Sequence, residues 1–214
     1  LESPADVIEA DIWYRGNDIY IRHERRVGPL PVLIDRQMRG HRLPPLSLVL
    51  WRSYYLRPEF RPLKLGQLLD AVRGKKRLLL DVKGRYRGRQ VGAFAWTLAR
   101  KIAEHDAGEW VAVCGQVYPV LDRVREAAPQ VEVRYSIEQA YQWKAFKRMA
   151  REDDKVRAIC IEHRFINEKR ARFVEEKGID LYCWTVDDPA EAKRLVEQGV
   201  DGIISNDLRL LGGL

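Results

Sequence analysis

The sequence contains little cysteine: only three such residues occur among 214. An odd count without paired spacing excludes a disulfide framework of the kind that holds small secreted domains, and it excludes a zinc knuckle. Cys114, Cys160 and Cys183 each lie in an apolar run that predicts a strand. We therefore expect three small buried thiols in a reducing, cytoplasmic environment.

Long apolar runs are also absent, since no stretch reaches the roughly 20 apolar residues that a bilayer span requires. The opening residues 1–6 lack the basic and then apolar pattern of a signal peptide. We expect neither a signal peptide nor a stable membrane anchor. With 46% hydrophobic and 32% charged residues, the chain suits one compact domain over residues 1–214.

The charge is unbalanced toward the basic side, with a formal net charge of +7. Such a balance suits an anionic substrate or a nucleic acid. The basic residues are scattered among Glu and Asp, however, and no basic block with interleaved aromatics occurs. We expect a small anionic substrate and no nucleic-acid partner. The sequence does not indicate an oligomeric state.

Strands and helices alternate along most of the chain. Apolar runs predict strands over 7–13, 77–82, 110–114, 131–135, 156–161, 181–186 and 202–205. Helical spacing predicts helices over 65–72, 91–105, 119–128, 136–151, 167–177 and 189–198. This alternation is typical of parallel βα units, and we predict an α/β TIM (β/α)₈ barrel. Seven strands are counted where the closed barrel has eight, and the strand before the first helix is the one we expect to be missing. Either that segment lies outside this sequence, or the barrel is open or is closed by another segment.

Two segments depart from that rhythm. Residues 18–23 are interpreted as a continuation of the first strand after a kink at Gly16 and Asn17. Residues 25–62 contain six prolines and no clear periodicity, and we predict an irregular insertion there. A functional lid and a surface excursion that packs on its own aromatic residues are equally open for this insertion.

The first strand carries acids on one face. Side chains alternate along a strand, so Glu9, Asp11 and Trp13 share one face and apolar residues share the other. Asp81 and Lys83 share a face at the end of a later strand. Catalytic residues of this fold come from such strand ends, so we expect Glu9, Asp11 and Asp81 to meet at the barrel mouth.

Three converging carboxylates repel one another unless a cation lies between them, and oxygen ligands select Mg²⁺ or Ca²⁺. Lys83 would offer charge to a phosphate oxygen, and His23 would transfer a proton near neutral pH. These parts predict metal-assisted attack on a phosphodiester. The alternatives stay open: Glu9 and Asp11 as residues of a half-exposed strand, and Lys83 as a solvated loop residue.

Further polar or aromatic residues are predicted at strand ends. One of them, Trp184, would either line the substrate pocket or pack inside the barrel. His163 is expected to be a surface or loop residue. The others are Gln116, Arg134, Ser136, Glu162, Asp187, Asn206 and Asp207.

These motifs together resemble the glycerophosphodiester phosphodiesterase family. Residues 7–13 are similar to its second-strand motif, residues 21–24 to its His-Asp motif and residues 79–83 to its Glu-x-Lys strand. Residues 183–188, followed by 199–206, resemble its C-terminal signature. The resemblance implies hydrolysis of glycerophosphodiesters to glycerol phosphate and an alcohol.

The resemblance also implies roles for single residues. Glu9, Asp11 and Asp81 would bind a divalent metal, His23 would be one of a catalytic His pair, Lys83 would contact phosphate and Trp184 would line the pocket.

Three departures from the family pattern are visible. Asp81 stands where the family usually has Glu, Glu24 stands where Asp is usual, and the opening His-Arg-Gly and Glu-Asn-Thr motifs do not occur. A lipid phosphodiesterase of the same fold and a catalytically disabled barrel that binds phosphoesters remain as alternatives. A sugar-phosphate isomerase or aldolase is disfavoured, because no Gly-rich phosphate loop precedes the last strand.

Overall fold

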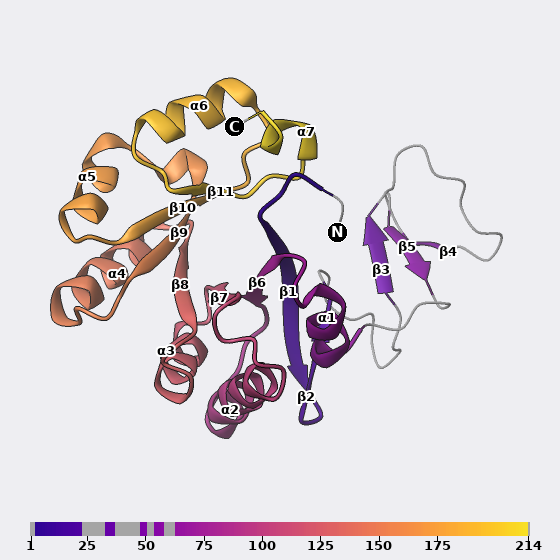
Figure 1. Ribbon diagram of the computed structural model, residues 1–214. Coiled ribbons are helices and arrows are strands. Elements are labelled where there is room, and N and C mark those ends of the chain that lie inside the picture. The colour runs from indigo at the N-terminus through magenta and orange to yellow at the C-terminus, as the bar shows by residue number, and fades with distance from the viewer. Residues whose placement is uncertain (1–2, 23–32, 37–47, 51–53, 58–62, 214) are drawn as a thin grey trace.

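The computed structural model describes residues 3–22, 33–36, 48–50, 54–57 and 63–213 (Figure 1). Its main feature is an eight-stranded sheet with the order β11-β10-β9-β8-β7-β6-β1-β2. All neighbours in this order are parallel except β1 and β2. The seven parallel strands expected from the sequence are therefore present.

The strands of the large sheet follow the predicted ranges closely. Their bounds are β1 Val7–Arg15, β2 Asp18–Ile21, β6 Arg77–Val82, β7 Val111–Gly115, β8 Glu132–Ile137, β9 Ala158–Glu162, β10 Asp180–Trp184 and β11 Gly202–Ile203. Figure 1 shows this sheet curling into a half-barrel with helices around its outside. The arrangement confirms the TIM-type fold, and within the described part of the chain no ladder joins β11 to β1 or β2.

The helices cover the outer side of the sheet. They are α1 Leu65–Val72, α2 Arg89–Glu104, α3 Tyr118–Ala127, α4 Ala140–Glu152, η1 His163–Phe165, α5 Glu168–Glu176, α6 Pro189–Glu197 and α7 Leu208–Leu211. None of the helices in the described ranges is long and apolar enough to cross a membrane.

The start of α4 differs from the prediction of a helix from residue 136. Ser136 and Ile137 are buried in β8 instead, and the helix begins at Ala140. The side-chain oxygen of Gln142 accepts hydrogen bonds from the backbone N–H groups of residues 138 and 139, at 2.8 Å each. These two bonds satisfy the backbone N–H groups that lie just before the first turn, so the helix begins after the strand has ended.

The interpretation of residues 18–23 as a kinked continuation of the first strand is wrong. β2 turns back and pairs antiparallel with β1, with Arg15 opposite Asp18 and Ile12 opposite Ile21. Gly16 and Asn17 have φ values of 54° and 64°. Two consecutive residues with positive φ form the tight turn whose twist matches a β-hairpin.

The interval 25–62 contains three short strands rather than irregular chain alone. They are β3 Leu33–Arg36, β4 Leu48–Leu50 and β5 Tyr54–Arg57, and they form an antiparallel sheet in the order β3-β5-β4. Among the described residues, these strands pair only with one another. The rest of the interval lies outside the described residues.

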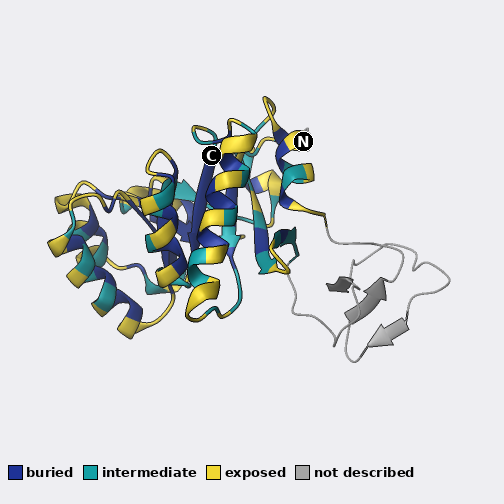
Figure 2. Ribbon diagram, turned by 90° about the horizontal axis from the view of Figure 1, so that it is seen from below, coloured by how far each residue is buried: buried dark blue, intermediate teal, exposed yellow. Residues whose placement is uncertain are grey.

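Most of the core lies between the sheet and the helices. Figure 2 shows buried residues concentrated on the strands and exposed residues on the outward sides of the helices. Ile12 of β1, Leu80 of β6 and Phe94 of α2 are fully buried there. A second, smaller apolar cluster of Leu79, Ala112 and Cys114 belongs to the opposite face of the sheet. The three cysteines are free and buried, as expected.

Candidate active site

Three carboxylates meet on the inner face of β1 and β6. The parallel register of these strands pairs Asp11 with Asp81 and Glu9 with Leu79. One carboxylate oxygen from each of Glu9, Asp11 and Asp81 lies within 4.8 Å of the other two. The structure therefore brings together the three acids that the alternation of the sequence placed on one face.

The opposite face of β1 explains why the acids point inward. Ile12 is fully buried, and Ile8 and Ala10 pack against the main core beneath the helices. Because side chains alternate along a strand, burying these three residues outward directs Glu9 and Asp11 inward. The apolar face of the strand thus fixes the orientation of its acidic face.

Lys83 lies directly beside two of the acids. Its Nζ is 2.5 Å from Oδ2 of Asp81 and 3.1 Å from Oδ1 of Asp11. Its backbone N–H donates to the carbonyl of Ile12 at 3.0 Å, which continues the ladder past the end of β6. Lys83 thus lies in the loop just past β6 with a partly exposed side chain, and that side chain bridges the two strands.

The pKa values in the cluster are shifted because several ionisable side chains lie close together. Glu9 is exposed by its accessible surface, yet desolvation by the neighbouring protein atoms, followed by the charges of Asp11 and Asp81, raises the pKa of its carboxyl to about 8. Burial also raises the pKa of Asp81, although Lys83 opposes the rise. Burial alone would lower the pKa of Lys83, but the two aspartates raise it above its usual value. One ammonium therefore faces three acids, and negative charge is in excess when all are ionised.

The dimensions of the cluster suit one hard cation. Oxygens on opposite sides of a shared ion are separated by twice the metal–oxygen distance, about 4 Å for Mg²⁺ and about 5 Å for Ca²⁺. The three carboxylate oxygens fall within 4.8 Å of one another. An all-oxygen set with excess negative charge is the donor set that these ions prefer.

Two residues of β7 lie against Asp81, and neither was predicted from the sequence to be part of the site. Cys114 is the residue of β7 that pairs with Asp81 in the parallel register of β6 and β7. Gly115 has a φ of 147°, and a Cβ added there would lie 3.2 Å from Oδ1 of Asp81 and 2.9 Å from the carbonyl oxygen of Val82. A glycine that directly follows a buried strand was the available signal for such a close approach.

The remaining predicted site residues are distributed unevenly. His23 lies outside the described residues. Trp184 is half-buried at the end of β10, opposite Glu162 of β9. Trp13 shares the face of the acids, and its indole N–H donates to the carbonyl of Arg22 at 3.0 Å.

Arg134 does not lie at the end of its strand, which corrects that prediction. It is the third residue of β8, buried, paired with Glu132 and placed 3.4 Å over the centre of the Tyr182 ring. Gly202 lies against the same ring, where a Cβ would come within 2.5 Å. Arg134 therefore belongs to a packed layer inside the sheet and not to the mouth.

Two other strand-end residues have structural partners. Asp187 accepts hydrogen bonds from Ser205 Oγ at 3.0 Å and from the backbone N–H of Asn206 at 2.8 Å, so it ties together the segments that follow β10 and β11. His163 Nδ1 lies 3.1 Å from Oε1 of Glu191 on α6.

Comparison with known proteins gives a consistent result. The model of the glycerophosphoryl diester phosphodiesterase family matches residues 87–210, which is more than half of the chain. This range does not include the three clustered acids. A glycerophosphodiester phosphodiesterase of Arabidopsis thaliana is 34% identical over 58 residues, a match that covers 27% of this chain and 18% of the plant protein.

Solved structures show the same fold at low identity. A glycerophosphoryl diester phosphodiesterase described as putative, from Silicibacter pomeroyi, gives a TM-score of 0.73 at 14% identity, covering 96% of this chain and 83% of that one. A phosphodiesterase from Oleispira antarctica, in complex with the product sn-glycerol-3-phosphate, gives 0.61 at 12% identity, covering 92% and 79%.

Proposed function

This chain belongs to the glycerophosphoryl diester phosphodiesterase family, and from that premise we propose that it hydrolyses glycerophosphodiesters to glycerol phosphate and an alcohol with the aid of Mg²⁺ or Ca²⁺. The proposed partner is a small phosphodiester from lipid metabolism, in the cytoplasm. Three buried free thiols are compatible with that reducing compartment.

The observation that carries the proposal is the convergence of Glu9, Asp11 and Asp81 within 4.8 Å. The three side chains come from adjacent parallel strands, and their shared face is the inner one. Asp81 is the residue before the last of β6, Asp11 pairs with it, and the carboxyl ends of the strands are where chemistry takes place in a barrel of this type. We assign the three acids as metal ligands on this basis.

The proposed mechanism gives each side chain one task. Glu9, Asp11 and Asp81 would hold a dication, which would supply polarisation of the phosphoryl group toward attack by water. Lys83, held by Asp11 and Asp81, offers positive charge to a non-bridging phosphate oxygen. His23 is assigned the proton that the attacking water loses or the leaving alcohol gains, because an imidazole titrates near neutral pH. Trp184 is assigned to the wall that contacts the organic part of the substrate.

The first test measures hydrolysis of glycerophosphocholine with Mg²⁺, with Ca²⁺ and with EDTA. We expect turnover that EDTA abolishes and that either ion restores. A Glu9→Ala, Asp11→Ala double variant should lose both turnover and calorimetric metal binding. A matched double variant, Glu175→Ala, Glu176→Ala, removes two exposed acids of α5 and should retain both. Equal metal binding by the two variants would refute the ligand assignment.

The same assay separates the alternatives. Turnover of a lysophospholipid or release of a cyclic phosphate, without turnover of glycerophosphocholine, would favour a lipid phosphodiesterase of the same fold. Binding of glycerophosphocholine without any turnover would favour a phosphoester-binding barrel, in which Lys83 balances the acids without catalysis.

A further inference from the structure

A second site is suggested by a hollow of about 350 Å³ on the outer wall, between α4 and α5. These helices lie side by side outside the sheet (Figure 1). The acidic cluster belongs to the other, inner face of the sheet. Four cations, two aromatic residues and one amide line the hollow: Lys147, Arg151, Lys169, Arg170, Trp143, Phe173 and Asn167. No carboxylate lines it.

The aromatic residues form a fixed floor. The rings of Trp143 and Phe173 meet edge to face, with their centres 5.5 Å apart, and Trp143 is only 9% exposed. The guanidinium of Arg170 lies 5.9 Å from the centre of the Trp143 ring, and that of Arg151 lies 6.0 Å from the Phe173 ring. Both distances are at the outer limit of a cation–π attraction, and Arg170 stacks more closely on Phe165, whose ring centre is 3.7 Å from the guanidinium.

The four cations have no acidic partner among the described residues. The ion pairs of that part of the chain include none of Lys147, Arg151, Lys169 and Arg170. The guanidinium of Arg170 donates to the carbonyl of Phe165 at 2.6 Å, and its pKa is lowered by burial.

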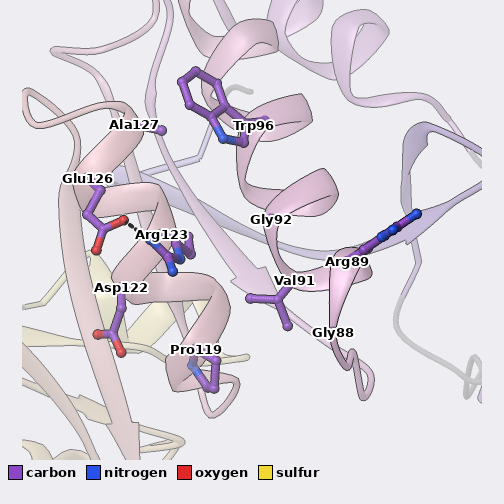
Figure 3. Close-up of a pocket in the computed structure, with 10 residues that line it drawn as sticks. All are labelled: Gly88, Arg89, Val91, Gly92, Trp96, Pro119, Asp122, Arg123, Glu126 and Ala127. Atoms are coloured by element: carbon purple, nitrogen blue, oxygen red, sulfur yellow. Dashed lines mark hydrogen bonds and ion pairs between the residues drawn. The ribbon is translucent and has the colours of Figure 1, made fainter.

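A larger hollow elsewhere on the outer wall differs in how its charged residues are paired. This hollow of about 740 Å³ lies between α2 and α3 (Figure 3). There Arg123 pairs with Glu126 at 2.6 Å, and Asp122 accepts a hydrogen bond from the Tyr135 hydroxyl at 2.7 Å. Three of the four charged residues that line it, all but Arg89, thus have partners among the described residues. In the hollow between α4 and α5 only one of the four cations has such a partner, Arg170 with the carbonyl of Phe165.

The placement of the cations is unfavourable without a ligand. Lys147 and Arg151 are four residues apart on α4, so they are neighbours on the helix surface, where like charges destabilise a helix. The two cations of α5 add to the same repulsion across the hollow. An anion bound between the helices would remove this repulsion and engage the donors of both helices.

We propose that this hollow binds a phosphate monoester dianion. Guanidinium forks and lysine ammonium groups are the side chains that match phosphate oxygens. A volume of about 350 Å³ is at the lower end of the range of roughly 300–1,000 Å³ for small-ligand sites. The aromatic floor would contact the organic part of the ester. The monoester can come from a free metabolite or from the head group of phosphatidic acid.

The test uses inorganic phosphate as the probe, titrated calorimetrically into the full chain at constant ionic strength with EDTA present. The test variant Lys147→Gln, Arg151→Gln removes two cations of the hollow. The matched control Lys144→Gln, Arg148→Gln removes the same charge at the same spacing from exposed positions of the same helix, outside the hollow. We expect at least tenfold weaker binding in the test variant and less than a twofold change in the control.

A second arm identifies the source of the phosphate. Vesicles of phosphatidylcholine with and without phosphatidic acid are sedimented with each protein. Sedimentation with phosphatidic acid that only the test variant loses supports a lipid source, and calorimetric binding without sedimentation supports a free monoester.

The proposal is overturned if the wild-type chain binds neither probe, or if both variants lose affinity equally, since net charge alone would then explain binding. Circular dichroism establishes that the variants are folded. If the test variant is unfolded, Lys169→Gln replaces it, with a loss of at least threefold expected and an unchanged affinity counting against the site.

Discussion

Substitution of Gly115 by Ala tests how closely the packing behind Asp81 is fitted. A non-glycine residue in a sparsely populated region such as φ 147° costs about 1–3 kcal/mol. The added Cβ would also lie 2.9 Å from the carbonyl oxygen of Val82, which is backbone and yields little. Overpacking of this kind costs about 1–3 kcal/mol. We expect a total near 4 kcal/mol, or a Tm lower by about 8–16 °C for a chain of this size.

Substitutions at two other glycines separate the cost of backbone strain from the cost of overpacking. Gly178 has a φ of 61° with nothing within 4 Å of an added Cβ, so Gly178→Ala should cost only backbone strain, about 1–2 kcal/mol. Gly92 lies in α2 with open space around it, so Gly92→Ala should stabilise the chain by up to about 1 kcal/mol. Thermal unfolding followed by circular dichroism ranks the three variants.

The same Gly115→Ala variant bears on the proposed metal centre. The added methyl group would press on Oδ1 of Asp81, so we expect calorimetric Ca²⁺ affinity to fall at least tenfold while the Gly178→Ala variant keeps wild-type affinity. A Tm within 2 °C of wild type would refute the packing argument. A large Tm loss with unchanged Ca²⁺ affinity would separate Asp81 from the metal.

Three further predictions follow from single side chains. His23→Ala should lower glycerophosphocholine turnover at least 100-fold with little change in calorimetric metal affinity; retained turnover would exclude His23 as the proton carrier. Lys83→Met should lower kcat at least 100-fold because the phosphate loses a cation, and an unchanged kcat would reassign Lys83 to charge balance alone. Hydrogen bonds from Arg194 and His163 lower the pKa of Glu191 to about 2, although burial opposes this shift. The ionised Glu191 side chain therefore stabilises the fold above pH 4.5, the ordinary pKa of a glutamate, and this contribution is lost as the pH falls toward 2. The gap in unfolding free energy between wild type and Glu191→Gln, about 1 kcal/mol at pH 6, should therefore close over that window in urea titrations, and a constant gap would contradict the assignment.

Local patterns in the sequence predicted much of the fold because parallel βα units have a clear signature. Alternation in residues 7–13 placed Glu9 and Asp11 on one face, and the strand end at residue 81 supplied the third acid. These inferences require only the two-residue period of a strand and the common direction of parallel strands.

Features that depend on register or on a turn were harder to predict. The Gly16–Asn17 turn was interpreted as a kink, although two such residues between alternating runs also signal a hairpin, as the structure has it. The contact of Lys83 with Asp11 exists because Asp11 pairs with Asp81, and a single sequence does not specify that register. Arg134 was placed at the mouth because its strand was predicted to end at residue 135, yet β8 continues to Ile137, and Glu132 and the Tyr182 ring compensate the buried charge.

The single strand β1 specifies the hydrophobic core with one face and the acidic cluster with the other. Ile12 and Asp11 are neighbours in sequence with opposite environments, one beneath the helices and the other beside Lys83. Deletion of one residue between positions 8 and 12 would exchange the two environments. Carboxylates would then face the hydrophobic core, and aliphatic side chains would face the inner side of the sheet. Substitutions can therefore change the acidic cluster without changing the core, whereas a one-residue insertion or deletion within these positions would disrupt both the core and the cluster.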